Sequence, residues 1–130
     1  MSSDHPAPSP IPVALLSAWV EQAFLRAGLS ATDAAIATEP LVLSDAMGVF
    51  THGTKLLPGY LKKLVARGSK PDARPRIVRQ GPGFAVLDGD ASLGQIGCHF
   101  AVDVAIEKAR NVGVAYVGLR NTGHIGAAGA

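Results

Sequence analysis

The spacing of hydrophobic residues predicts that the first half of the chain is helical. Between Ile11 and Ala27, apolar residues recur at steps of three and four, which predicts an amphipathic helix that ends at Gly28. Ser30, followed three positions later by Asp33, resembles a capping box with a shorter acid than usual. This pair predicts the start of a second helix.

The second predicted helix contains a proline. Pro40 lies within the segment from Thr32 to Met47, where a proline removes one backbone donor and crowds the preceding turn. The segment therefore either kinks or consists of two short helices, and it ends at Gly48. Another apolar stripe, from Leu56 to Val65, predicts a further helix that is closed by Gly68.

After a proline-rich connector, the hydrophobic period changes from helical to strand-like. The runs RIVRQ and FAVLDG, joined by Gly81, Pro82 and Gly83, predict a β-hairpin. Apolar positions then predict a helix from Gln95 to Val112 that is closed by Gly113. The apolar run VAYVGL, which follows this helix, predicts a buried strand.

The order of these elements predicts an α/β fold. We expect a flexible leader over residues 1–10, a helical N-terminal segment over residues 11–70 and the start of an α/β layer over residues 71–130. The last strand runs into RNTGHIGAAGA, and nothing there caps a domain. We therefore expect that the α/β layer is truncated.

Composition is typical of a soluble globular protein. Hydrophobic residues make up 48% of the sequence and charged residues 17%, and no apolar run is long enough to cross a bilayer. The first ten residues contain three prolines and no apolar segment, so we expect no secretory signal, no membrane association and a cytoplasmic protein.

One stretch is strongly basic although the net charge is only +2. Its basic residues, which face the single acid Asp72, are Lys62, Lys63, Arg67, Lys70, Arg74, Arg76 and Arg79. Nucleic-acid sites interleave such charge with aromatic residues, whereas Tyr60 is the only aromatic residue within reach here. We interpret the stretch as a solvated helix face and linker, and we expect no nucleic-acid partner.

The single cysteine and the glycine-rich segments offer little chemistry. Cys98 has no partner for an internal disulfide and no zinc-like ligand spacing, so we expect a small buried apolar residue. GPGFAV lies between two strands, and LGQIG lacks the lysine and hydroxyl of a phosphate-binding loop. The sequence has no nucleophile elbow and no paired-histidine metal motif, which disfavours hydrolases and metal sites.

Two of the four histidines are candidates for catalysis. His52 and His124 each lie in a glycine-flanked irregular segment after a regular element, where a side chain can point into a cleft. Histidine moves protons near neutral pH because its unperturbed pKa is about 6.5. Taken alone, each residue is more often a turn histidine that binds its own backbone.

Three motifs, taken in order, resemble those of the malate/L-lactate dehydrogenase family, which includes ureidoglycolate, sulfolactate and piperideine-2-carboxylate enzymes. They are SDAMGVFTHGTKLLPGYLKKL, FAVLDGDASLGQIG and AIEKARNVGVAYVGLRNTGHIGAAG, and the resemblance extends from about Val13 to Ala130. It implies a mixed-sheet α/β fold that is not a Rossmann fold. It also implies a longer chain, a homodimer and a nicotinamide cofactor, NAD or NADP.

The resemblance implies roles for individual residues. His52 matches the histidine of the family's SHG motif, which donates or accepts the proton at the substrate oxygen. Thr51 stands in the serine position, where its hydroxyl can bond the imidazole or the substrate. His124 matches the second active-site histidine, near the reactive end of the nicotinamide. Asn121 is expected to bind the substrate, and Gly126, together with His124, the cofactor.

One position departs from the family pattern. Many members have an arginine four residues after the motif histidine, where a guanidinium holds the substrate carboxylate through two parallel hydrogen bonds. This chain has Leu56 there, and we expect the adjacent Lys55 to bind the substrate instead. An ammonium does not reproduce the guanidinium fork, so the identity of the acid stays open.

The resemblance therefore implies hydride transfer between NAD(P) and a small 2-hydroxy or 2-keto acid, with His52 moving the proton. Two other hypotheses stay open. A cofactor-free epimerase or lyase would use His52 and His124 as acid and base, and a non-catalytic binding or assembly module would need neither. We expect the 130 residues alone to be inactive and to expose an apolar helix face that promotes association.

Overall fold

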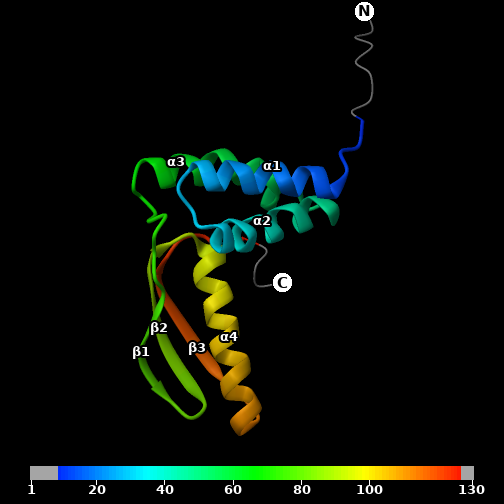
Figure 1. Cartoon of the computed structure of the whole chain (residues 1–130). Coiled ribbons are helices and arrows are strands. Elements are labelled where there is room, and N and C mark those ends of the chain that lie inside the picture. The colour runs from blue at the N-terminus through cyan, green and yellow to red at the C-terminus, as the bar shows by residue number, and fades with distance from the viewer. Residues whose placement is uncertain (1–8, 127–130) are drawn as a thin grey trace, which may run out of the picture.

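The computed structural model describes residues 9–126, which form helices at one end and a small sheet beneath them (Figure 1). The predicted leader over residues 1–10 lies almost entirely outside this range, as do residues 127–130. The elements, in chain order, are α1 (Val13–Arg26), α2 (Ala31–Ala46), the 3₁₀ turns η1 (Phe50–His52) and η2 (Thr54–Leu56), α3 (Leu57–Val65), β1 (Arg76–Gly81), β2 (Phe84–Ser92), α4 (Gly94–Val112) and β3 (Tyr116–Thr122). Each predicted helix and strand is therefore present.

The first helix is amphipathic as predicted, but fewer of its apolar residues are buried than the pattern contains. Val20 and Phe24 are buried, whereas Leu15 and Trp19, which belong to the same apolar pattern, are exposed. Trp19 has 61% of its surface exposed. The expected exposed apolar face is therefore present on α1 of the described chain.

The second helix is continuous, so the alternative of two short helices is wrong. Ser30 caps it, because its Oγ accepts a hydrogen bond from the Asp33 backbone N–H at 3.1 Å. Pro40 removes only one donor from the helix, and the buried side chains of Leu41 and Val42 hold this part against the core. Gly48 has a φ of +77°, a left-handed conformation that favours glycine, and it follows the last turn.

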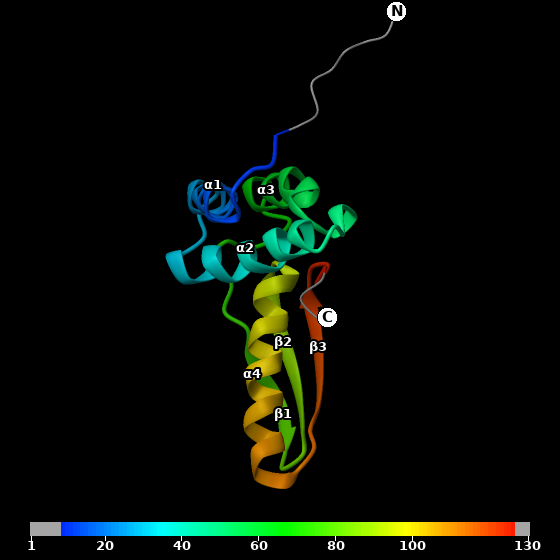
Figure 2. The same ribbon diagram turned by 90° about the vertical axis from the view of Figure 1, so that its right-hand side faces the viewer.

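Helices α1, α2 and α3 pack together across one end of α4 and the sheet (Figures 1 and 2). Their shared core also includes Leu93, which precedes α4, and Ile96 from the first turn of α4. These two residues join the helical part to the α/β part. A second cluster, built around Ala85, Leu87 and Val104, lies between α4 and the sheet.

The sheet is mixed, as expected. Its strand order is β1-β2-β3, with β1 antiparallel to β2 and β2 parallel to β3. The β1–β2 pairing confirms the predicted hairpin, and α4 is the crossover that makes β2 and β3 parallel. The carboxyl ends of β2 and β3 and the N-terminus of α4 consequently lie at the same end, beside the helices (Figure 2).

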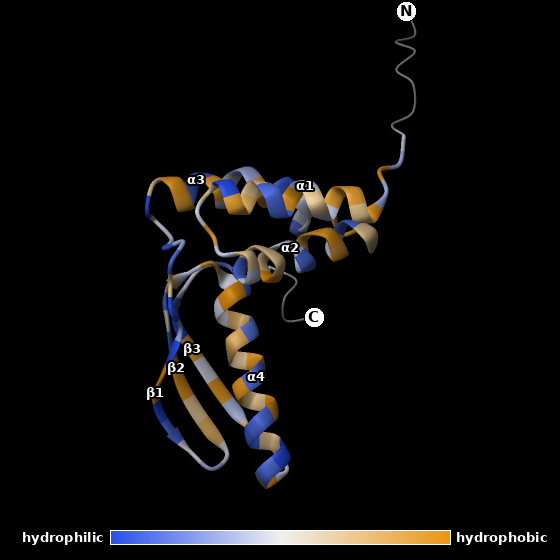
Figure 3. Cartoon of the chain, in the orientation of Figure 1, coloured by the Kyte–Doolittle hydropathy of each residue, from blue (hydrophilic) through white to orange (hydrophobic). Residues whose placement is uncertain are grey.

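Two burial predictions are wrong. No residue of β3 is buried, because α4 covers one face of the sheet and the described residues leave the other open, with Tyr116 77% exposed. Hydrophobic residues occur along the strands as well as on the helices (Figure 3). Cys98 is half-buried rather than buried, and this partial burial raises the pKa of its thiol.

Candidate active site

The two candidate histidines, which lie far apart in the sequence, meet in one pocket. The ring centroids of His52 and His124 are 5.9 Å apart, and their planes are tilted by 31°. The pocket measures about 290 Å³ and lies between the turns after α2, the helix α3 and the loop after β3. It is lined by Thr51, His52, Leu56, Gly59, Tyr60, Lys63 and His124.

The turn that carries His52 is anchored to the end of α2. Thr54 donates two hydrogen bonds to the Asp45 carboxylate, one from its backbone N–H at 3.1 Å and one from its hydroxyl. A Cβ on Gly53 would lie 1.7 Å from Oδ1 of Asp45, so the carboxylate fits against this turn only because residue 53 is glycine. These contacts explain the glycine of the THG motif and fix the turn beside His52.

The loop that carries His124 packs closely on the N-terminus of α4. A Cβ on Gly94 would lie 2.1 Å from the carbonyl oxygen of His124 and 2.6 Å from that of Gly123. Gly94 is therefore required for close approach of two backbone segments. The backbone N–H of Gly123 also donates to the Ser92 carbonyl at 3.1 Å, which ties the loop to the end of β2.

Hydrogen bonds define the proton position on His124. Its Nδ1 accepts from the Gly126 backbone N–H at 3.1 Å, and the Tyr60 hydroxyl lies 3.4 Å from the same atom. Because Nδ1 accepts from an amide, the neutral ring carries its proton on Nε2. His124 therefore has a donor available for another group, whereas Gly126 holds the ring in place.

Thr51 contacts the other histidine. Its Oγ1 lies 3.1 Å from Nδ1 of His52, which leaves Nε2 of His52 without a partner in the described residues. His52 is half-buried, and Thr51 and His124 are exposed. The arrangement places two imidazoles, each oriented through its Nδ1, in a pocket that solvent reaches.

Two predicted substrate-binding residues lie outside this pocket. Lys55 is exposed and is not among the lining residues, although the adjacent Leu56 is. Asn121 donates from Nδ2 to Oδ1 of Asp88 at 2.9 Å. This hydrogen bond, together with one from the Asp90 backbone, holds the pKa of Asp88 below its usual range. The structure thus uses Asn121 to stabilise the LDGD turn.

Four lining residues were not predicted as site residues: Leu56, Gly59, Tyr60 and Lys63. Of these, Tyr60 and Lys63 have polar side chains. Tyr60 was assigned to the apolar stripe of α3, and Lys63 to a solvated basic face. All seven basic residues of that stretch are exposed, as expected, but Lys63 also borders the pocket. Tyr60 and Lys63 lie three residues apart, which places them on one side of α3. This spacing is the sequence signal that could have assigned both residues to the site of His52.

Gln95 presents unsatisfied polar atoms next to this site. Its side chain is 1% exposed, and neither its Oε1 nor its Nε2 has a hydrogen-bond partner in the part of the chain that the structure describes. A Cβ built on Gly126 would lie 4.0 Å from Nε2 of Gln95 and 3.9 Å from the Tyr60 hydroxyl. The amide therefore lies beside the hydrogen-bonded group around His124.

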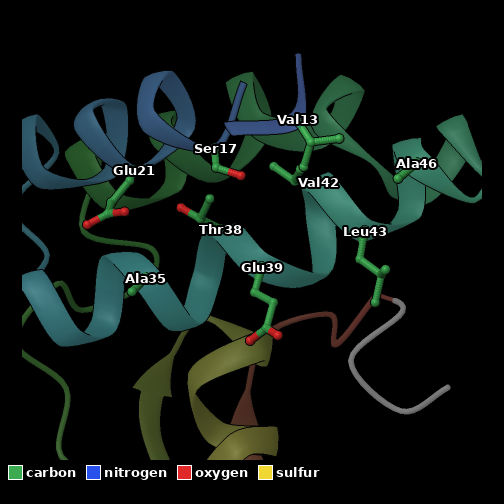
Figure 4. A pocket seen from close by; sticks show the side chains of 9 residues that line it. All are labelled: Val13, Ser17, Glu21, Ala35, Thr38, Glu39, Val42, Leu43 and Ala46. Carbon is green, nitrogen blue, oxygen red and sulfur yellow. The ribbon is translucent and has the colours of Figure 1, made fainter. Parts of the chain in front are cut away.

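Another hollow lies between α1 and α2, away from the histidines. It measures about 320 Å³ and is lined mainly by apolar residues, with Glu21 from α1 and Glu39 from α2 (Figure 4). It contains no histidine, which makes it a weaker candidate for proton transfer.

Within residues 9–126, no cluster of three or more His, Cys, Asp or Glu side chains suits a metal. None of the helices in this range is long and apolar enough to span a membrane.

Comparison with known proteins gives one consistent result. The chain is 36% identical to malate dehydrogenase of Pyrococcus abyssi over 119 residues, which is 92% of this chain and 33% of that protein. It is 39% identical to L-sulfolactate dehydrogenase of Methanocaldococcus jannaschii over 102 residues, or 78% of this chain and 30% of that protein. The chain spans about a third of the length of the curated relatives it matches.

Solved structures agree with the sequences. Malate dehydrogenase from Pyrococcus horikoshii superimposes with a TM-score of 0.89 and 31% identity, over 91% of this chain and 34% of that one. These neighbours confirm the expected α/β fold that is not a Rossmann fold. Residues 11–130 match the sequence pattern described as malate/L-lactate dehydrogenase, and the chain belongs to that family.

Proposed function

We propose that the complete gene product transfers a hydride between a nicotinamide cofactor and a small 2-hydroxy or 2-keto acid. The observation that carries this proposal is the meeting of His52 and His124 in one pocket, 5.9 Å apart. The pocket lies at the carboxyl end of β3, where open α/β sheets commonly bind ligands. The chain's relatives include malate and sulfolactate dehydrogenases, which act on acids of this class.

Proton transfer is assigned to His52 in this proposal. Reduction of a keto acid needs a proton at the carbonyl oxygen, and oxidation of a hydroxy acid needs the reverse. Thr51 orients His52 through Nδ1, so that Nε2 is the atom that exchanges the proton with the substrate oxygen. His124, whose Nδ1 accepts from Gly126, presents its Nε2–H as a second hydrogen-bond donor to the reacting groups.

The residues present fit the reacting end of a nicotinamide cofactor. His124 and Gly126 would border its ring, and the unpartnered amide of Gln95 lies beside them, where a buried polar group calls for a partner. When bound, the nicotinamide supplies or accepts the hydride. The pocket of about 290 Å³ suits a small acid. The hydrogen bond from the Gly126 backbone N–H to Nδ1 holds the imidazole of His124 in position.

The remaining features of the proposal rest on the composition of the sequence and on the family resemblance. We propose NAD or NADP as the cofactor, a homodimer as the assembly, the cytoplasm as the location and inactivity of the 130 residues on their own. A relative in Escherichia coli, 33% identical over 108 residues, is named ureidoglycolate dehydrogenase (NAD(+)). Lys55 and Asn121 stay predicted substrate-binding residues, although neither lines the pocket.

The proposal is tested by following oxidation of NADH and NADPH by the complete gene product with a panel of 2-keto acids. Replacing His52 with Ala should lower turnover by on the order of a hundredfold or more, because the proton donor is lost. The matched control is His99→Ala, since His99 lies on α4 outside the pocket and is exposed. Isotope exchange without cofactor would support the epimerase or lyase hypothesis instead, and inertness in both assays would support the non-catalytic module.

A further inference from the structure

One basic side chain belongs to the wall of the histidine pocket. Lys63 lies on α3, one turn after Tyr60, and Leu56 and Gly59 continue the same wall toward the start of the helix. Residues three and four apart share a face of a helix. The face that carries Gly59, Tyr60 and Lys63 borders the pocket that contains His52 and His124. Lys62, the neighbour of Lys63, is exposed and does not line the pocket.

The described residues do not neutralise the charge of Lys63. Every ion pair within residues 9–126 uses a basic residue other than Lys63. The residues that line the pocket include no aspartate or glutamate, and their other polar groups are hydroxyls and imidazoles. The pocket therefore has a positive charge on its wall and no described counter-ion.

We propose that Lys63 binds the carboxylate of the acid substrate. This inference rests on the proposed function and names the residue that recognises the acid. Every 2-hydroxy or 2-keto acid has a carboxylate next to the carbon that reacts, so a cation in the same pocket as the proton donors is placed to bind it. An ammonium on a long flexible stem extends from an exposed position, and a charge-assisted hydrogen bond to a carboxylate is stronger than a neutral one.

This assignment has a consequence for specificity. Leu56, which occupies the position of the family arginine, gives the pocket an apolar contact in place of a planar fork. Lys63 recognises a carboxylate as a point charge and leaves its plane free. The site should therefore select strongly for the negative charge of the substrate and weakly for the orientation of its carboxylate.

The test uses the complete gene product and measures two quantities. The first is KM for the best 2-keto acid of the panel and for its neutral methyl ester. The second is the affinity for oxamate, a carboxylate that is not reduced, and for its neutral counterpart oxamide, measured by calorimetry. Lys63→Met should raise KM and the oxamate Kd by roughly 10- to 100-fold, because a charge-assisted hydrogen bond is lost. The ester and oxamide should bind as before.

Three further variants make the test specific. Lys63→Arg should restore most of the oxamate affinity, and Lys62→Met should leave it unchanged. Increasing salt should weaken oxamate binding to the wild type and much less to Lys63→Met, since salt screens an exposed ion pair that the variant lacks. If Lys55→Met, and not Lys63→Met, weakens oxamate binding, the inference is overturned in favour of Lys55.

The two levels of the proposal fail separately. An active dehydrogenase whose KM and oxamate affinity do not change in Lys63→Met keeps the proposed function and refutes the role of Lys63. A protein that oxidises no nicotinamide but loses oxamate affinity in Lys63→Met refutes the dehydrogenase and keeps the carboxylate site.

Discussion

The contact between Gly94 and the His124 loop leads to a quantitative prediction for Gly94→Ala. In an open helical position this substitution stabilises a protein by about 1 kcal/mol. Here the new Cβ would lie 2.1 Å from the carbonyl oxygen and 2.3 Å from the carbonyl carbon of His124, and the contact must lengthen to at least 3.0 Å. Overpacking of this kind costs about 1–3 kcal/mol. We expect the free energy of unfolding to fall by about 2 kcal/mol.

The same displacement should impair the site. A shift of about 1 Å in a loop that carries a reacting group costs on the order of a hundredfold in turnover. The assays are urea unfolding and NAD(P)H oxidation by the complete gene product. The matched control is Gly118→Ala in β3, the strand that leads to the same loop, because a Cβ there meets no atom within 4 Å. Equal stability of Gly94→Ala and the wild type would refute the reasoning from close packing.

Two further predictions concern polar groups near the site. Gln95→Met should raise the stability of the cofactor-free protein by about 1 kcal/mol or more, because the buried amide has no described partner; a loss of stability in urea would show that the amide is satisfied in the complete protein. The lowered pKa of Asp88 means that its ionised form stabilises the fold above the unfolded pKa of about 3.9, and that this contribution is lost as pH falls through the lower folded pKa. Asp88→Asn should therefore flatten the decline of stability in acid, measured as the urea midpoint between about pH 5 and about pH 3; parallel declines would contradict this.

The helices could be predicted from the sequence because their signals are local. Ser30 caps α2 as predicted, and Gly113, in a left-handed conformation, ends α4 where the sequence placed its end. The two 3₁₀ turns around His52 were not predicted, because each covers only three residues, and Thr54 of the second turn is held by Asp45, which lies outside both turns. The spacing of hydrophobic residues carries no information about a hydrogen bond such as that between Thr54 and Asp45.

The composition of the site could be predicted only in part. His52 and His124 were singled out by their glycine-flanked positions, and the structure brings them together. Lys63 was assigned to a solvated face because the sequence shows charge and not what lies opposite it. The burial of β3 was predicted wrongly for a related reason: a continuous apolar run is typical of a strand covered on both faces, but α4 covers only one face within the described residues.

The parallel pairing of β2 and β3 also affects the order of folding events. The contacts within α1, α2 and α3 join segments that are close in sequence, and such contacts form quickly. Pairing β2 with β3 closes the whole connection that contains α4, which is a longer loop and costs more entropy. Only this later step brings residue 124 to residue 52. This topology predicts that the helical core forms before the two histidines meet, so that a ligand of the pocket can stabilise only the fully assembled fold.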